Sequence, residues 1–586
     1  MTKMKKYILL LLVFAAFSCT ETEKKSNTDG DRAFDKVTED YIKEYLDWRP
    51  QTGVMLGLHE YDGKLADYSK ASIDAELARL KKYDKNLSEM DSASLSYKKY
   101  YDWKMLRSSI KNEIFIIEDL NIYTKNPIFY FWAIDVNIYI KRNFAPIEQQ
   151  IKSIIAIENM VPQFFENAKM NLQDTLAIPH IQLAIDMARG SASFMETDLL
   201  VALKEVKNET LMKEFATANQ KAIDAFNSFV VFLVKEKLPQ GNNDYAIGKE
   251  NYQKMLLYGE AINMTPDEIL SIGMNELKKE QASFNAAAKI INPNKKPIDV
   301  YNELQSEHPT AQSLIPDAKK NIEAIRQFLV DNKIVTMPSE VRVKVAETPA
   351  FARATSTASM DTPGPFETKA TEAYYYITPV DPRWTAKQKE DWLAQFNFYT
   401  TDIVSIHEAY PGHYTQFLHL NASDASKIQK IFYSYAFVEG WAHYTEKMLI
   451  DAGYGNTGDL IKAAKFRMAQ SGEALLRICR LCVSIKTHCQ GMNVEEATQF
   501  FMANWYQGDK PSRQEAMRGT YDPGYLFYTL GKLQILKLRE DYKKQEGENY
   551  SLQKFNNAML DNGMPPIQIM RELLLKDKME WPNILD

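Results

Sequence analysis

Apolar residues recur at intervals of three and four along most of this chain, and this spacing limits the fold more than any other feature. The pattern is typical of amphipathic helices that bury one face. Pro and Gly each occur only 23 times in 586 residues, which favours long helices. We therefore predict a mainly α-helical protein, with helices over residues 34–48, 72–87, 95–112, 146–171, 209–237 and 265–287.

Strand signals are confined to a region that precedes a histidine-containing segment at residues 406–413. Residues 341–346 alternate apolar and polar side chains, and residues 372–378 are rich in aromatic and branched side chains. Between them, Ser, Thr, Gly and Pro predominate in residues 356–365, which predicts a loop. We expect a small β-sheet beside the helices that carry the histidines.

A weak boundary lies at residues 239–243, where Pro and Gly interrupt the helical pattern. It separates a predicted helical N-terminal half, residues 34–240, from a C-terminal half, residues 241–586, that contains the histidine segment. We expect the two halves to form one large bilobed body with a deep cleft.

The first residues are typical of an export signal. Three lysines precede an apolar stretch at residues 7–17, which is too short to span a bilayer comfortably. Residues 1–18 are therefore a predicted signal peptide. The following Cys19 lies in a segment that resembles a bacterial lipobox, so we expect it to be lipidated, with ordinary secretion as the alternative. Residues 19–33 are a predicted flexible tether, which places the protein in the cell envelope, on the periplasmic or outer-membrane face.

Charge and cysteine content exclude two other classes. The formal net charge is −6 and no basic block stands out, so nucleic acid is not an expected partner. Besides Cys19, only Cys479, Cys482 and Cys489 remain, and an odd, clustered trio is not a disulfide framework. We expect small buried residues on a helix face, with pairing or metal binding as the less favoured alternatives.

The segment at residues 406–413, with sequence IHEAYPGH, has the residue types of a catalytic zinc site. Its histidines, His407 and His413, are six positions apart, and a regular helix would turn the second about 120° away from the first. Pro411 and Gly412 favour a break between them, because Pro lacks an amide hydrogen and Gly tolerates unusual dihedrals. We predict that both histidines bind one Zn²⁺ ion across a distorted turn.

A second segment, residues 438–446 with sequence VEGWAHYTE, can complete the site. Glu439 is the predicted third ligand. Glu446 lies almost two helical turns further on the same face and is predicted to orient a ligating histidine, while His443 competes as a ligand or a supporting donor. Glu408 is the predicted general base that takes a proton from zinc-activated water.

These two segments, together with residues 251–252, 264–269 and 522–528, resemble the bacterial domain-of-unknown-function family 885. The resemblance covers most of the chain that follows the predicted signal peptide. The family looks like gluzincin metallopeptidases, in which two histidines and a downstream glutamate hold zinc in a mostly helical, cleft-bearing fold. The resemblance implies ligand roles for His407, His413 and Glu439, and the base role for Glu408.

The residues that would contact a substrate are less defined. By resemblance, Tyr528 is the first candidate to stabilise the transition state, and Tyr525 and Tyr521 are alternatives. The strand at residues 374–376 could pair its edge with an extended peptide, or it could be a plain core strand. Three arginines could recognise a substrate carboxylate: Arg383, Arg480 and Arg518.

The sequence therefore predicts a lipid-anchored zinc metallopeptidase of the cell envelope that acts on peptide substrates. One alternative is a zinc hydrolase of non-peptide amides or esters, because the same chemistry serves those bonds. Another is a non-catalytic binding lipoprotein of the envelope. The sequence leaves open the peptide preference, internal or terminal cleavage, the membrane leaflet and the oligomeric state.

Overall fold

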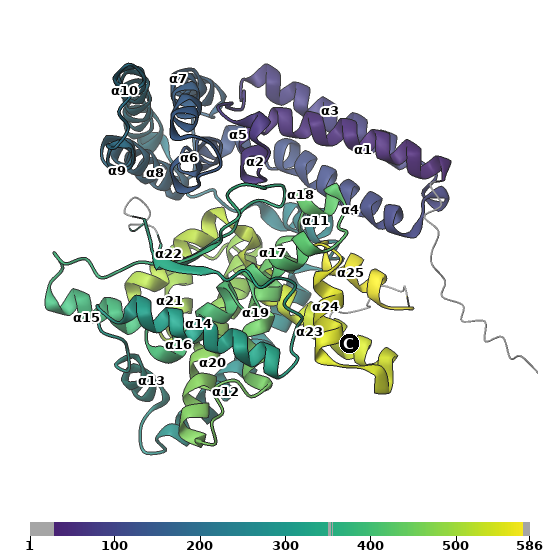
Figure 1. Cartoon of the computed structure of the whole chain (residues 1–586), viewed down its shortest axis with the longest axis vertical. Helices are drawn as coiled ribbons and strands as arrows, with labels where there is room; N and C mark the ends of the chain where they lie inside the picture. Colours follow the sequence, from purple (N-terminus) through teal and green to yellow (C-terminus); the bar gives the residue numbers. More distant parts are fainter. Residues whose placement is uncertain (1–27, 350–352, 354–355, 578–586) are drawn as a thin grey trace, which may run out of the picture.

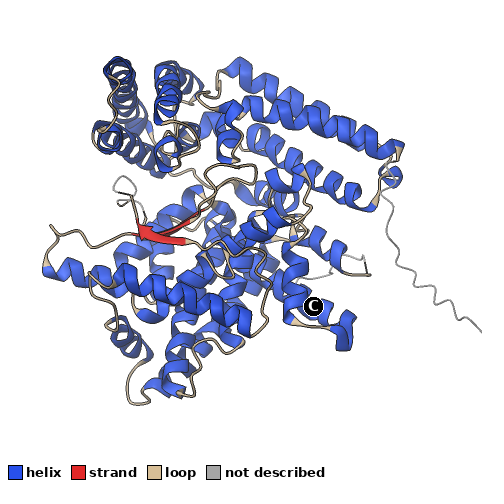
Figure 2. Cartoon of the chain, in the orientation of Figure 1, coloured by secondary structure: helices blue, strands red, loops and turns tan. Residues whose placement is uncertain are grey.

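The computed structural model describes residues 28–349, 353 and 356–577, and helices make up most of them (Figures 1 and 2). The prediction of a mainly α-helical protein with one small sheet is confirmed. The predicted signal peptide and the lipidation site Cys19 lie outside the described residues. Among the described helices, each is too short or too polar to cross a membrane.

The N-terminal helices pack around one hydrophobic core, rich in Tyr and Phe, that runs from Phe34 to Leu233. All predicted helices of this half are present. Their bounds, with those of the shorter helices, are α1 (Asp29–Trp48), α2 (Pro50–Met55), α3 (Lys70–Glu89), α4 (Tyr97–Ile114), α5 (Ile122–Lys125), α6 (Ile138–Lys141), α7 (Ile147–Asn171), α8 (Ile178–Glu196), α9 (Asp198–Leu203) and α10 (Glu209–Phe232).

The start of α1 corrects the predicted tether. The helix begins at Asp29, so residues 29–33 are helical and do not belong to a flexible tether. The Thr28 side chain accepts a hydrogen bond from the backbone N–H of Asp31, and two aspartates occupy the first turn. A capping hydroxyl and negative charge at a helix N-terminus are both stabilising, and they outweigh the polar composition of this segment.

A second core runs from Tyr252 to Leu575 and contains most of the remaining helices. These are α11 (Gly248–Glu260), α12 (Pro266–Ile291), α13 (Pro297–Gln305), α14 (Leu314–Asp331), α15 (Ala386–Gln395), α16 (Phe398–Glu408), α17 (His413–Ala422), α18 (Lys427–Ile431), α19 (Tyr435–Asp451), α20 (Leu460–Gln490), α21 (Val494–Trp505), α22 (Asp509–Tyr521), α23 (Phe527–Glu546), α24 (Leu552–Leu560) and α25 (Ile567–Leu574).

The two cores divide near the predicted boundary, but the chain crosses between them more than once. Ile428, Ile431 and Phe432, in and just after α18, pack into the N-terminal core. Phe115 makes the opposite exchange and packs into the second core. The halves are therefore interlocked, because each contributes apolar side chains to the core of the other.

The small sheet has the strand order β1-β3-β2, with β1 (Lys344–Glu347) parallel and β2 (Ala358–Asp361) antiparallel to the central β3 (Tyr374–Ile377) (Figure 2). Two expectations need correction. Residues 358–361 lie in the predicted loop, yet they pair with the tyrosine-rich strand, because ladder pairing overrides weak local propensity. The strand at residues 374–376 is central, so neighbours already occupy both its edges and it cannot add a peptide there.

The sheet lies beside the helices that carry the histidines, as predicted. The Ser405 hydroxyl on α16 donates a hydrogen bond of 3.3 Å to the Tyr375 hydroxyl on β3. The Val343 N–H, next to β1, donates to the hydroxyl of Tyr410, which follows α16. The long helix α20 passes through the second core, where Cys479 and Cys482 are buried and free, in agreement with the favoured prediction.

Candidate metal centre

The helix that contains His407 ends before His413. Helix α16 ends at Glu408, α17 begins at His413, and the peptide bond between Tyr410 and Pro411 is cis. At Gly412 an added Cβ atom would lie 1.7 Å from the carbonyl oxygen of His407, so only glycine fits. The indole of Trp441 donates a 2.9 Å hydrogen bond to the Pro411 carbonyl. The predicted break is confirmed, and α19 holds it in place through Trp441.

Helix α19, which carries Glu439, packs closely against α23, which carries Tyr528. The contact is made by two glycines. An added Cβ on Gly440 would lie 2.6 Å from the Gly531 Cα, and one on Gly531 would lie 2.0 Å from the Ala436 carbonyl oxygen. Close approach of two helix backbones requires glycine at these positions. The glycine of the Glu-Gly-Trp-Ala segment thus brings Tyr528 towards Glu439.

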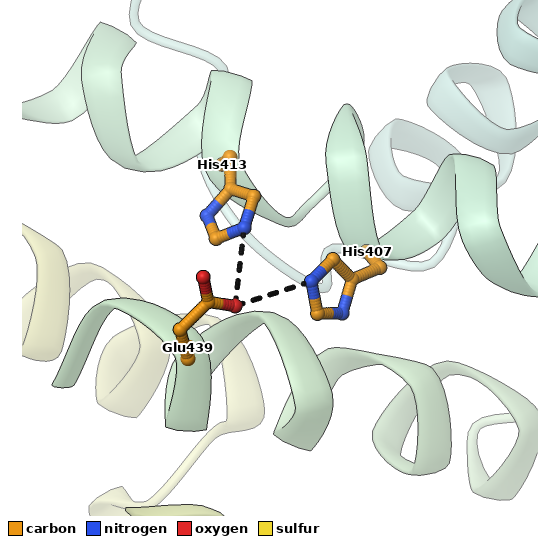
Figure 3. A group of neighbouring side chains, drawn as sticks. All are labelled: His407, His413 and Glu439. Carbon is orange, nitrogen blue, oxygen red and sulfur yellow. Dashed lines mark ion pairs between the residues drawn. The ribbon is translucent and has the colours of Figure 1, made fainter. Parts of the chain in front are cut away.

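His407, His413 and Glu439 point towards one another from three helices (Figure 3). The Oε2 atom of Glu439 lies 3.4 Å from the His407 Nε2 and 3.5 Å from the His413 Nε2. One potential ligand atom from each residue lies within 4.8 Å of the other two, and no other such group of three is found among the described residues. The structure therefore brings together the three predicted ligands.

The separations fit a tetrahedral zinc ion. Zn–N and Zn–O bonds of about 2.0–2.1 Å place neighbouring ligand atoms about 3.3 Å apart. Glu439 Oε2 is buried, has no hydrogen-bond partner among the described residues and faces only the two imidazoles, at distances suited to a shared metal ion. Two imidazoles and one carboxylate also leave a fourth position open, as catalytic zinc sites require.

Each histidine is held through its other ring nitrogen. His407 Nδ1 lies 2.7 Å from Oε1 of Glu446, and His413 Nδ1 lies 3.0 Å from Oε1 of Gln416. These acceptors favour a proton on Nδ1 and leave the Nε2 lone pairs free to bind a metal. Glu446 takes the predicted orienting position. Gln416 was missed, although its place three residues after His413 on one helix face was a usable signal.

Glu446 is the centre of a buried charge network. Its Oε2 accepts from His443 Nδ1 at 3.1 Å, and Arg477 lies 3.3 Å from its Oε1. Although burial opposes its charge, Arg477 and the two imidazoles hold the pKa of Glu446 well below its usual range. Burial lowers the pKa of His443 to about 3, so this imidazole is neutral. His443 contacts Glu446 and does not belong to the group of three potential ligands.

The arrangement of the three side chains also favours a proton on His407. Burial opposes a charge on His407, but Glu439 and Glu446 outweigh it and raise the pKa of His407 to about 9. The pKa of Glu439 is well below its usual range, because the two imidazoles outweigh the cost of its burial. A metal ion that binds here must displace the proton from His407.

Glu408 and Tyr528 flank this group. The Glu408 carboxylate directly follows His407 in the chain, is half-buried and forms no hydrogen bond or ion pair with any described residue. The Tyr528 ring lies 6.3 Å from the His407 ring and nearly parallel to it. Burial and the charge of Glu439 raise the pKa of the Tyr528 hydroxyl, so it remains a hydrogen-bond donor.

The two alternative tyrosines lie elsewhere. Tyr525 is buried against Gly519 and its hydroxyl has no partner among the described residues. Tyr521 packs against the N-terminal core. Of the three candidates, Tyr528 is therefore the one that contacts a predicted ligand. The remaining histidines hydrogen-bond to other groups: His59, His180, His308, His419 and His488.

Two solved structures share this fold. A predicted lipoprotein of unknown function from Shewanella oneidensis is 24% identical, with a TM-score of 0.78, and the match covers 93% of this chain and 100% of that one. A predicted lipoprotein from Colwellia psychrerythraea is 16% identical, with a TM-score of 0.77, and the match covers 93% of this chain and 98% of that one. No curated protein matches significantly. A family model matches residues 50–574, and the chain therefore belongs to the DUF885 family of bacterial proteins of unknown function.

Proposed function

We propose that this protein is a zinc-dependent peptidase in which His407, His413 and Glu439 hold the metal. The observation that carries the proposal is the convergence of these three side chains around a buried carboxylate oxygen that has no hydrogen-bond partner among the described residues. Glu439 Oε2 lies 3.4 and 3.5 Å from the two Nε2 atoms, which is longer than a usual N–H···O hydrogen bond and close to the separation of two ligand atoms on one zinc ion.

Each neighbouring group has a role in this proposal. A bound zinc ion would activate water and polarise the scissile carbonyl. Glu408 takes the proton from the water and passes it to the leaving amine. The Tyr528 hydroxyl donates a hydrogen bond to the oxygen that becomes negative in the transition state. Glu446 and Gln416 fix the orientation of the two histidines.

The first test is the substitution Glu408→Gln. It removes the base and keeps the size of the side chain, and Glu408 is not among the proposed ligands. We expect the variant to bind one zinc ion per chain, as measured by elemental analysis, and to lose at least about a thousandfold in kcat. Unchanged turnover would contradict the role of Glu408, and a wild-type protein that binds no divalent metal would contradict the whole proposal.

The second test concerns the bond that is cleaved. The zinc-loaded protein is incubated with a peptide library, and the products are identified by mass spectrometry. This experiment distinguishes the three candidate functions. Peptide cleavage supports the proposal. Hydrolysis of non-peptide amide or ester substrates alone supports the first alternative, and zinc binding without any hydrolysis leaves a binding lipoprotein.

We also propose that Cys19 is lipidated and attaches the protein to a membrane of the cell envelope. The support is the lipobox-like segment and the two structural relatives, which are themselves described as predicted lipoproteins. We expect the wild-type protein in the membrane fraction and the Cys19→Ala variant in the soluble or unprocessed fraction. Equal membrane association of both would contradict lipid attachment.

A further inference from the structure

We infer that Arg518 binds the C-terminal carboxylate of the substrate, so that the proposed peptidase acts on peptides with a free carboxyl end close to the scissile bond. This inference rests on the proposed function and adds the class of substrate. It is carried by the arrangement of three arginines around Tyr528, of which Arg518 has the most exposed side chain and bonds to a single carboxylate oxygen.

The three arginines surround the Tyr528 ring. The guanidinium carbons of Arg477, Arg480 and Arg518 lie 6.0, 5.1 and 5.8 Å from the ring centroid. The ring also neighbours Tyr435 and His407, with 5.9 and 6.3 Å between the ring centroids. These guanidinium groups therefore lie next to the candidate metal centre, where a substrate would bind.

Two of the three are almost fully buried and paired with glutamates. Arg480 donates from Nε and Nη2 to both oxygens of Glu515, at 2.7 and 2.8 Å. Arg477 contacts Glu446 at 3.3 Å and Glu473 at 2.6 Å, although its Nε has no hydrogen-bond partner among the described residues. The side chains of both arginines are only 9% exposed, which leaves a ligand little access to either guanidinium.

Arg518 differs in exposure and in pairing. Its side chain is 28% exposed. Its Nε and Nη2 both donate to the same oxygen, Oδ2 of Asp522, at 3.0 and 2.9 Å, so the planar fork is not matched by two oxygens. Nη2 also donates to the Tyr435 hydroxyl at 3.2 Å, and the guanidinium carbon lies 5.8 Å from the centre of the Tyr528 ring. A guanidinium beside a phenol hydroxyl is suited to a carboxylate.

The distance to the metal centre sets the length of the substrate end. The two ring contacts through Tyr528 place the Arg518 guanidinium no more than about 12 Å from the His407 ring. An extended peptide spans about 3.3–3.6 Å per residue. The bound carboxylate therefore lies one to three residues beyond the scissile bond. Arg383 does not take this role. It is paired with Asp381, and its side chain is 87% exposed, so nothing places it beside Tyr528 or the candidate metal centre.

The test compares tripeptides that carry a free carboxylate with the same tripeptides as C-terminal amides. For the zinc-loaded wild-type protein we expect amidation to lower kcat/KM about a hundredfold, mostly through KM. The Arg518→Gln variant should lose a similar factor on the free acids, so that it no longer prefers acids over amides. Arg518→Lys should recover part of the preference, and Arg383→Gln, the matched control, should behave as wild type.

Three results would overturn the inference. These are equal cleavage of acids and amides by the wild type, an unchanged acid preference in Arg518→Gln, and loss of cleavage on N-terminal acetylation in place of amidation. The last result would assign Asp522 to a substrate ammonium group instead.

A binding experiment separates this inference from the proposed function. N-acetyl-alanyl-alanine and its amide are titrated into Glu408→Gln by calorimetry, and the acid should bind at least tenfold more tightly. The Glu408→Gln/Arg518→Gln double variant should lose the difference. Acid-selective binding without hydrolysis by the wild type would refute the peptidase and keep the carboxylate site. Hydrolysis without acid-selective binding would refute the carboxylate site alone.

Discussion

At the scale of single residues, the candidate site depends on hydrogen bonds that fix which nitrogen of each histidine faces Glu439. Glu446 and Gln416 accept from the Nδ1 atoms of His407 and His413, and the two Nε2 atoms then face Glu439. Gln416 also donates to the Val438 carbonyl at 3.3 Å, next to the third ligand, so it links α17 to α19. The orientation of His413 therefore depends on a residue outside both motifs.

We predict that Gln416→Leu weakens zinc binding about 10–100-fold without unfolding the protein. The substitution removes the acceptor for His413 Nδ1, and loss of such a partner typically costs that much affinity. Zinc affinity measured by competition with a chromogenic chelator checks the prediction. Gln499→Leu, at an exposed position on α21, is the control and should bind zinc as the wild type does. Equal affinity of both variants would show that Gln416 does not orient His413.

At the scale of elements, the break between α16 and α17 and the contact between α19 and α23 both depend on glycine. Gly412 lets the chain turn back over the His407 carbonyl, and Gly440 with Gly531 lets two helix backbones touch. The first brings the two histidines together, and the second brings Tyr528 towards them. Such close approaches leave no room for a Cβ atom.

We predict that Gly412→Ala destabilises the protein by about 2–4 kcal/mol and abolishes zinc binding, because its Cβ would overlap the His407 carbonyl oxygen. Urea unfolding and elemental analysis measure the two effects. Gly190→Ala is the matched control: no atom lies within 4 Å of its added Cβ, and it lies in the exposed part of α8, so it should stabilise by up to about 1 kcal/mol. A stable, zinc-binding Gly412→Ala variant would refute the role of this glycine.

At the scale of the whole molecule, the candidate metal centre lies on helices of the second core, and the N-terminal core holds part of the same segment in place. Ile428, Ile431 and Phe432 anchor the segment before α19 in the N-terminal core. From there the chain enters α19, where Glu260 accepts hydrogen bonds from the first backbone amides. The N-terminal core also buries Glu158, whose two carboxylate oxygens have no hydrogen-bond partner among the described residues.

We predict that Glu158 makes the fold less stable as pH rises. Burial raises the pKa of Glu158 from 4.5 to about 9, so the folded state keeps this carboxyl protonated while the unfolded state ionises it. Stability is therefore lost progressively between about pH 4.5 and pH 9. Glu158→Gln removes the ionisation and should stabilise by on the order of 2–3 kcal/mol at pH 7, with little effect near pH 4.5.

Urea unfolding at pH 5 and pH 8 measures this difference. Glu214→Gln, on the exposed side of α10 in the same half, is the control and should follow the wild type at both values. Equal loss of stability between pH 5 and pH 8 in the wild type and in Glu158→Gln would contradict the prediction. The Glu158 carboxyl would then not be the cause of the pH dependence.

Much of this fold could be predicted because its signals are local. Helical periodicity and the Pro-Gly pair each act within a few residues, and the helices and the break that they predict are confirmed. The start of α1 and the position of β2 could not be predicted as well. A single capping hydroxyl decides the first, and pairing with a strand more than ten residues away decides the second.

The sequence by itself determined which residues could bind a metal and where the helix must break, because residue type and helical geometry suffice for both. Only the tertiary structure decided the rest: that Gln416 accepts a hydrogen bond from His413, that Tyr528 and not Tyr521 or Tyr525 lies beside His407, and that Arg518 is the most exposed of the three arginines around Tyr528. Those outcomes depend on contacts between helices far apart in the chain, and a periodic pattern carries no information about which distant side chains will meet.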